Sequence, residues 1–217
     1  MNLRPINKED YDLILELDRK VYPTIHPVTK ETLNRWYSQN PEFGMIYEEN
    51  NKVKGVCIVI PLNLNGWRGL IAGDLAEADL NESTIFDNSR DKEIGIHIYH
   101  IEKLDQSLKN FHTICLDYMA KEIKKLKLEN KSLRVGGFSG LCVTSAGISL
   151  FRNKLNCKES DYVCKEYIFE KDGEKQLFTL KSAEEISNLT EEGYTFVNRC
   201  QMLVTYPNEE SVVWSFI

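Results

Sequence analysis

The sequence predicts a mixed α/β fold, and three observations support that prediction. Segments with strand periodicity and segments with helix periodicity follow one another along most of the 217 residues. The stretch over residues 93–104, EIGIHIYHIEKL, alternates like a strand. A polar turn then leads into apolar residues at helical spacing from Phe111. A strand that feeds a helix N-terminus is an arrangement suited to binding phosphate, because the first helical turn has unpaired N–H groups.

Each expected element follows from local signals of capping, periodicity and turn formation. In chain order we expect a strand at 3–6, a helix after Asn7, a helix capped by Thr29, strands at 43–48 and 53–61, one strand and a mobile loop within 62–92, a strand at 93–104, a helix at 111–128, a strand at 133–138, a helix from Thr144 to Lys154, a strand at 162–170, a short strand from Gln176, a helix at 183–188, and a hairpin of 195–205 with 211–216.

Composition limits the class of function. The chain has 27 basic and 33 acidic residues and a net charge of −6, which argues against nucleic acid as a partner. The N-terminus lacks an apolar signal segment, and no apolar run has the length needed to cross a membrane. The six cysteines lie at irregular spacings within apolar segments, so we expect reduced thiols and a cytoplasmic protein. The four histidines form no ligand cluster, so we expect no metal.

Four segments together resemble the GNAT superfamily of N-acetyltransferases: LRPINKEDYDLILELDRKVYP, FGMIYEENNKVKGVCIVIPL, EIGIHIYHIEKL with the following helix, and TSAGISLFRNKLNCKESD. The resemblance covers residues 1–170 and implies a mostly antiparallel central sheet flanked by helices, with 171–217 as a C-terminal extension packed on the same domain. It also implies acetyl-CoA as co-substrate and the transfer of an acetyl group to an amine of a small molecule or peptide, by a monomer or homodimer. A catalytically inactive GNAT-like module that binds a ligand or protein is the alternative.

The same resemblance implies which residues contact acetyl-CoA. They are the backbone of His100, Ile101 and Glu102, the turn and helix start at Lys109, Asn110, Phe111 and His112, and Phe151. The chain departs from the family at this half-site. The phosphate loop lacks the usual glycines, and Phe151 stands where many members have a tyrosine that protonates the departing thiolate. Gly136, Gly137 and Gly140 are either places of close ligand approach or structural glycines at a bulge or turn.

Amine acylation requires a group that removes a proton from the amine. Regular alternation puts Glu93, His97, Tyr99 and Ile101 on one face of the strand and His100 on the other. His97 is therefore the first candidate for the catalytic base, and Glu93 the second. The resemblance implies that the acceptor amine lies against Tyr22, His26, Trp36 and Tyr37, with the segment around Trp67 on the opposite side.

Overall fold

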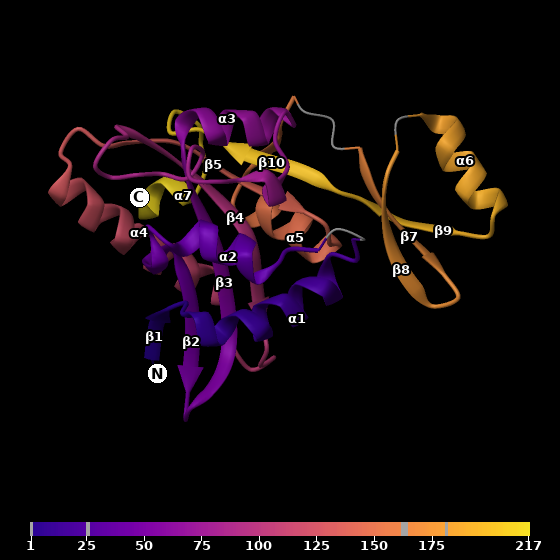
Figure 1. Ribbon diagram of the computed structural model, residues 1–217, viewed down its shortest axis with the longest axis horizontal. Helices are drawn as coiled ribbons and strands as arrows, with labels where there is room; N and C mark the ends of the chain where they lie inside the picture. The colour runs from indigo at the N-terminus through magenta and orange to yellow at the C-terminus, as the bar shows by residue number, and fades with distance from the viewer. Residues whose placement is uncertain (1, 25–26, 162–164, 181) are drawn as a thin grey trace.

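The computed structural model describes residues 2–24, 27–161, 165–180 and 182–217 (Figure 1). A seven-stranded sheet has the order β1-β2-β3-β4-β5-β10-β6, and a three-stranded sheet has the order β8-β7-β9. The strands are β1 (Asn2–Pro5), β2 (Gly44–Glu49), β3 (Lys52–Asn63), β4 (Glu93–Lys103), β5 (Arg134–Cys142), β6 (Lys158–Glu159), β7 (Glu166–Lys171), β8 (Glu174–Thr179), β9 (Thr195–Arg199) and β10 (Gln201–Thr205). The helices are α1 (Tyr11–Val21), α2 (Lys30–Tyr37), α3 (Leu64–Ala72), α4 (Phe111–Glu129), α5 (Ser145–Ser149), which continues as a wider turn over Leu150–Lys154, α6 (Ala183–Glu191) and α7 (Val213–Phe216).

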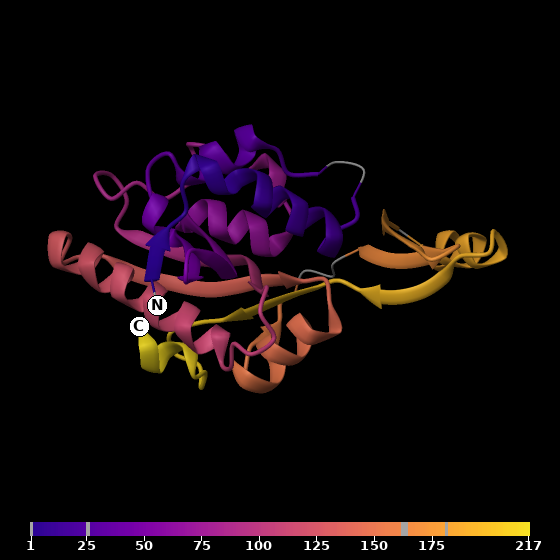
Figure 2. The same ribbon diagram turned by 90° about the horizontal axis from the view of Figure 1, so that it is seen from below.

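Helices cover both faces of the main sheet (Figure 2). Helices α1, α2 and α3 lie on one face, and α4, α5 and α7 lie on the other. Neighbouring strands of the main sheet are antiparallel except for β4 and β5, which are parallel. The small sheet projects from one end of the molecule together with α6 (Figures 1 and 2). The prediction of a mixed, mostly antiparallel α/β fold is confirmed.

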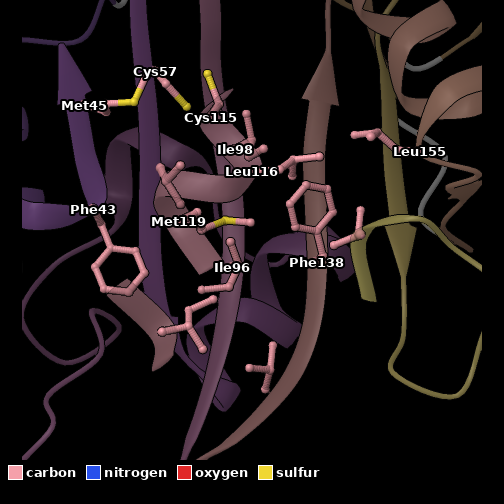
Figure 3. Close-up of a cluster of buried hydrophobic side chains, with 14 of the residues drawn as sticks. Phe43, Met45, Cys57, Ile96, Ile98, Cys115, Leu116, Met119, Phe138 and Leu155 are labelled. Atoms are coloured by element: carbon pink, nitrogen blue, oxygen red, sulfur yellow. The ribbon is translucent and has the colours of Figure 1, made fainter. Parts of the chain in front are cut away.

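Two apolar clusters hold the layers together. Under α4, the side chains of Leu116 and Met119 pack against Ile96, Ile98 and Phe138 of the sheet (Figure 3). The other cluster joins α1, α2 and α3 to the opposite face of the same sheet. Because successive side chains of a strand point to opposite faces, each central strand contributes to both clusters.

The start of the first helix is fixed by a capping box. The Asn7 side chain accepts a hydrogen bond from the backbone N–H of Glu9, and the Asp10 carboxylate accepts one from the backbone N–H of Asn7. Arg4 of β1 donates two hydrogen bonds to Asp10, of 2.7 and 2.8 Å, and also contacts Glu48 of β2. These contacts tie the first strand to its neighbour and to the helix that follows.

The Asp10 carboxyl makes part of the stability depend on pH. Burial acts to raise its pKa, but the hydrogen bonds from Arg4 and from the Asn7 backbone outweigh burial, so the pKa is lowered. A carboxyl whose pKa is lower in the folded state stabilises the fold above its unfolded pKa of about 3.9 and loses that contribution as the pH falls. We expect Asp10→Asn to lower the free energy of unfolding by about 2 kcal/mol at pH 7, measured by urea denaturation.

The difference between the wild type and Asp10→Asn should shrink steadily below about pH 4. Asp12→Asn is the matched control, because the Asp12 side chain is 79% exposed and its ion pair within the described residues is with the exposed Lys30. We expect the control to show no such dependence. An Asp10→Asn deficit of the same size at pH 7 and pH 2 would contradict the assignment.

Residues 64–72 form helix α3, so the expectation of one strand and a mobile loop within 62–92 is wrong. The Asn63 side chain accepts the Gly66 N–H and caps the helix, and Gly73 ends it with a φ of 82°. Trp67, Leu70 and Ile71 recur at helical spacing and are buried. The following segment is anchored by a bridge between Leu62 and Ile85.

The expected C-terminal hairpin is also wrong. Strand β9 belongs to the small sheet, whereas β10 lies in the main sheet between β5 and β6. Residues 211–216 do not pair with either strand, and the short helix α7 forms there instead. The Ser211 hydroxyl accepts the Val213 N–H at the start of α7, and Val213 is fully buried. Capping and burial together decide the conformation of this segment.

Candidate functional site

Strands β4 and β5 separate halfway along their length. They pair in parallel from Glu93 opposite Arg134 to Ile98 opposite Gly140. Beyond that point β4 stays paired with β3, and β5 pairs with β10. Residues 99–103 of β4 therefore have no strand partner on the side that faces β5. The result is a wedge in the sheet in which backbone groups of β4 are available to a ligand.

A cavity with a volume of about 220 Å³, the smaller of the two described below, lies in this wedge. Backbone and side chains from β4, β5, α1 and α5 surround it: Val21, Ile98, Tyr99, His100, Ile101, Glu102, Gly140, Leu141, Cys142, Val143, Thr144, Gly147, Leu150 and Phe151. The Phe151 ring stacks on Phe138 with a centroid distance of 5.8 Å. A Cβ atom at Gly140 would lie 2.5 Å from the Phe151 ring, so glycine is what lets this ring line the wedge.

Strand β4 has a β-bulge at the mouth of the wedge. His100 pairs with Ile58 and Ile98 pairs with the adjacent Val59, which leaves Tyr99 as an extra residue. Paired residues share a face, and Ile58 belongs to the cluster under α1 and α2. His97, Tyr99 and His100 therefore face α1 and α2, whereas Ile101 packs in the cluster under α4. The expectation of regular alternation is wrong beyond Tyr99.

The larger cavity, of about 630 Å³, lies on the face of the sheet that α1 and α2 cover. Its walls come from the loop after α1, from α3 and the segment that follows it, and from β4, β7, β8 and β10: Tyr22, Thr24, Val28, Leu70, Gly73, Leu75, Ala76, Glu77, Ala78, Tyr99, Leu141, Glu166, Gln176, Leu177, Phe178, Thr179 and Met202. Tyr99 and Leu141 line both cavities. The two cavities therefore meet where β4 and β5 separate.

The small sheet forms one wall of the larger cavity. The Leu177 N–H of β8 donates to the Pro23 carbonyl at 3.0 Å, and the Tyr22 hydroxyl donates to Glu166 of β7 at 2.6 Å. Both contacts join the loop after α1 to the small sheet. A molecule bound in this cavity would therefore be enclosed on one side by the small sheet.

A buried chain of hydrogen bonds ends at a carboxylate in the larger cavity. Trp67 Nε1–H donates to Ser139 Oγ at 2.9 Å, Ser139 Oγ lies 2.9 Å from His97 Nδ1, and His97 Nε2 lies 2.7 Å from Glu77 Oε1. His97 and Ser139 are fully buried. Glu77 follows α3 in the short 3-10 helix Glu77–Asp79 and lines the cavity.

The donors and acceptors in this series of hydrogen bonds define the tautomer of His97. Ser139 Oγ already accepts from Trp67, and within the described residues His97 Nδ1 is the acceptor left for the buried hydroxyl hydrogen. Nδ1 is then unprotonated and Nε2 carries the hydrogen. A carboxylate only accepts, so His97 Nε2–H donates to Glu77. His97 thereby holds the Glu77 carboxylate in place without entering the cavity.

A second carboxyl lies behind Tyr99. The Tyr99 hydroxyl donates to Asp18 Oδ1 at 2.5 Å, and Asp18 is 2% exposed. Asp18 Oδ2 is buried and has no hydrogen-bond partner within the residues that the structure describes. Burial raises the pKa of Asp18, and burial together with nearby carboxylates raises the pKa of Tyr99 and of Tyr22. Both phenols therefore stay protonated at neutral pH.

The structure separates the two candidates for the base. His97 is held behind Glu77, as described above. Glu93 lies at the other end of β4, contacts Arg134 at 3.3 Å, and lines neither cavity. Four strand residues, or about 13 Å, separate the two positions.

The residues expected to contact acetyl-CoA fall into two groups. His100, Ile101, Glu102 and Phe151 line the smaller cavity, and His100 Nε2 lies 2.7 Å from Glu102. The second group lies at the start of α4. Lys109 and Asn110 are exposed there, and Phe111 is buried against Gly55. The pKa of His112 is lowered, mainly by burial and to a smaller extent by the charge of Lys154.

Of the residues expected around the acceptor, Tyr22 lines the larger cavity. Trp36, Tyr37 and Trp67 are buried in the adjoining apolar cluster and do not line it. His26 lies outside the described residues. Glu77, Glu166 and Asp18 were not anticipated, because isolated acidic residues in polar segments carry no spacing signal that separates them from surface carboxylates.

The whole fold matches that of solved acetyltransferases. Arabidopsis thaliana Naa50, solved in complex with the bisubstrate analogue CoA-Ac-MVNAL, superposes with a TM-score of 0.53 at 8% identity, over 94% of this chain and 97% of that one. Arabidopsis thaliana NAA60, solved in complex with acetyl-CoA, gives a TM-score of 0.51 at 11% identity, over 96% and 99%. The chain adopts the GNAT fold. It is a divergent example of the GNAT fold, since no family model and no curated protein matches its sequence.

Two further features of this GNAT-fold chain concern other kinds of site. The described residues contain no group of three His, Cys, Asp or Glu side chains that could hold a metal ion. None of the described helices has both the length and the apolar character required to cross a membrane.

Proposed function

We propose that the protein is an acyl-CoA-dependent N-acyltransferase that moves an acetyl group from acetyl-CoA to an amine of a small molecule or peptide. One observation carries the proposal: two cavities, one in the wedge between β4 and β5 and one on the α1 and α2 face, meet at Tyr99 and Leu141. Each cavity accommodates one substrate, and their junction is where an acetyl group would pass between them.

The wedge suits the extended arm of acetyl-CoA. Residues 99–102 of β4 offer backbone groups without a strand partner on that side, and Phe151 supplies an apolar wall. The phosphates would lie at the start of α4, where helical N–H groups and the Lys109 ammonium favour anions. Asn110 adopts a φ of 52° there, a left-handed conformation that asparagine tolerates better than most residues other than glycine.

The larger cavity contains the group that takes the proton. The ammonium form of the acceptor gives a proton to Glu77, whose carboxylate is held by the Nε2–H of His97. The neutral nitrogen attacks the thioester carbonyl, and the tetrahedral intermediate collapses with loss of the CoA thiolate. The nitrogen loses its second proton to solvent as the amide forms, and Glu77 returns its proton to solvent. Solvent protonates the thiolate, because Phe151 has no proton to give. Glu93 has no part in this route, since it lines neither cavity.

Calorimetric titration with acetyl-CoA tests the proposal, with desulfo-CoA and adenosine diphosphate as controls. We expect micromolar binding that requires the pantetheine arm, and release of CoA when amines are supplied. Absence of binding at millimolar acetyl-CoA would overturn the proposal.

The second candidate is a catalytically inactive GNAT-like module, which the absence of a hydroxyl at Phe151 favours. Introducing that hydroxyl with Phe151→Tyr should keep or raise the rate of an active enzyme. A module that only binds would show no CoA release with either side chain. The buried free thiols of Cys57, Cys115 and Cys142 support a reducing, cytoplasmic setting for either function.

The contribution of Lys109 can be measured separately. We expect Lys109→Ala to weaken acetyl-CoA binding by about threefold to tenfold, because an exposed ammonium beside a phosphate contributes modestly. The loss should diminish as salt is added. Lys124→Ala is the control, since Lys124 is exposed farther along α4. Equal weakening by both variants would show a general charge effect and no phosphate contact at Lys109.

A further inference from the structure

Two pairs of residues lie next to each other on the face of the sheet that α3 covers. Gly95 of β4 is opposite Gly137 of β5. Two positions farther along the same strands, His97 is opposite Ser139. Residues two apart on a strand share a face, so the two glycines and the two polar residues all lie beneath the indole of Trp67.

The paired glycines let this indole lie directly against the sheet. A Cβ atom at Gly95 would lie 2.2 Å from Trp67 Cγ, and one at Gly137 would lie 2.0 Å from Trp67 Cη2. The indole therefore spans both strands at a distance that any other residue would prevent. This close approach brings the Trp67 Nε1–H to within 2.9 Å of Ser139 Oγ.

The hydrogen bond from Trp67 restricts what the Ser139 hydroxyl can do. Its own hydrogen points to His97 Nδ1, at 2.9 Å. If both ring nitrogens carried hydrogens, His97 would also donate to this oxygen, and the hydroxyl hydrogen would have no acceptor within the described residues. A buried hydrogen without an acceptor is costly. The arrangement therefore favours a neutral His97 whose hydrogen is on Nε2.

Other groups around His97 act in the opposite direction or are neutral. The Glu77 carboxylate, 2.7 Å from Nε2, would by itself favour a positively charged ring. On β4 the next titratable groups are Tyr99, whose hydroxyl donates to Asp18 of α1, and His100. Strand β3 places an apolar residue opposite His97. The neutral state is therefore decided on the Nδ1 side of the ring.

The charge of His97 matters for the group that it holds. A neutral ring donates a hydrogen bond to Glu77 and leaves the carboxylate its full negative charge. A charged ring would form an ion pair, and a carboxylate beside a cation accepts a proton less readily. The Glu77 side chain is only 11% exposed, so solvent would weaken this effect little.

We propose that Ser139 and Trp67 are positioning residues for the proton acceptor: they keep His97 neutral with its hydrogen on Nε2, so that Glu77 meets the acceptor amine as a fully basic carboxylate. Trp67, His97 and Ser139 line neither cavity, so they act through Glu77. This role rests on the proposed function, which assigns proton removal to Glu77. The position of the hydrogen on His97 is measurable without turnover.

Nuclear magnetic resonance of protein with ¹⁵N-labelled histidine reports directly which ring nitrogens carry hydrogens. The signals of His97 are identified by their loss in His97→Asn. We expect a neutral ring with its hydrogen on Nε2 from about pH 6 to about pH 8. A ring in this range with hydrogens on both nitrogens, or on Nδ1 alone, would overturn the inference, and this result does not depend on any variant that has to fold.

Ser139→Ala removes the hydroxyl, and a water in its place can accept a hydrogen from Nδ1. We expect the ring to gain its second hydrogen near about pH 6 in this variant. With trialanine as the acceptor, kcat should fall about tenfold near pH 6 and recover toward pH 8, whereas the KM for acetyl-CoA should stay within about twofold. Rates are compared as ratios to the wild type at each pH, so the ionisation of the acceptor itself cancels.

Thr205→Val is the matched control. Thr205 is another fully buried hydroxyl of the main sheet, and its Oγ1 accepts the Nε1–H of Trp214 at 3.1 Å. It lines neither cavity, and Trp214 packs in the cluster under α4. We expect this variant to lose stability but to keep the wild-type dependence of kcat on pH.

A Ser139→Ala enzyme with full kcat at every pH would overturn the positioning role, as would a deficit that does not vary with pH and that Thr205→Val shares. CoA release by a protein whose His97 is charged at neutral pH would support the proposed function and contradict this inference. Absence of acetyl-CoA binding by a protein whose His97 is neutral would overturn the proposed function and leave the position of the hydrogen standing.

Discussion

Glu77→Gln is expected to lower kcat for amine acetylation by about 100-fold, because glutamine cannot accept the proton that the ammonium must lose. The amide oxygen can still accept the hydrogen bond from His97 Nε2–H, so the substitution removes the proton acceptor and keeps this contact. Stopped assays of CoA release with a saturating amine would measure the effect. Acetyl-CoA affinity should remain within about twofold, because Glu77 does not line the smaller cavity.

The matched control is Asp79→Asn, which removes a carboxylate from the same 3-10 helix at an exposed position. Its kcat should equal that of the wild type. Raising the pH supplies more of the neutral amine and should restore part of the rate of Glu77→Gln, but only a little for the wild type. A Glu77→Gln enzyme with full kcat at neutral pH would assign proton removal to another group.

Gly137→Ala is expected to cost about 3 kcal/mol in the free energy of unfolding, or to prevent folding. A Cβ atom at Gly137 would lie 2.0 Å from the Trp67 ring, which is 1% exposed. The ring also packs closely over Gly95 and against Tyr206, at a centroid distance of 5.6 Å, so it has little room to move. Its displacement would also disturb the hydrogen bond from Trp67 to Ser139. Thermal and urea denaturation would measure the loss.

Gly136→Ala is the natural comparison on the same strand. The atom nearest to its added Cβ, at 2.5 Å, is the terminal methyl of Leu64, which can turn to another rotamer. We therefore expect a smaller loss at Gly136 than at Gly137. Equal losses would show that the strand, and not the tryptophan, sets the requirement for glycine.

Much of the fold was predictable because its signals are local. The strand and helix at 93–128 and the caps Asn7 and Thr29 follow from periodicity and capping. Asn63 and Gly73, which cap α3 at its two ends, were an equally local signal for this helix. The apolar residues between them favoured the prediction of a strand. The placement of β10 depends on pairing over long distances in the chain, which local patterns do not encode.

The candidate site was less predictable, for two physical reasons. The bulge at Tyr99 is invisible in the sequence, because EIGIHIYHIEKL alternates as if the strand were regular. A single inserted residue then reverses the faces of the side chains that follow it, His100 and Ile101. The role of Glu77 depends on tertiary contact with His97, twenty positions away in the sequence. Gly137 illustrates the same limit, since its requirement comes from contact with Trp67, seventy positions away in the sequence.

The position of β10 has a consequence for synthesis on the ribosome. Strand β5 ends at Cys142, and the strand that covers its free edge begins at Gln201. At about 5–20 residues per second, the intervening segment takes roughly 3–12 s to be made. During that interval the nascent chain presents the edge of β5 without its neighbour, and the larger cavity lacks the wall that Met202 of β10 supplies. The larger cavity is therefore completed only after β10 has been translated.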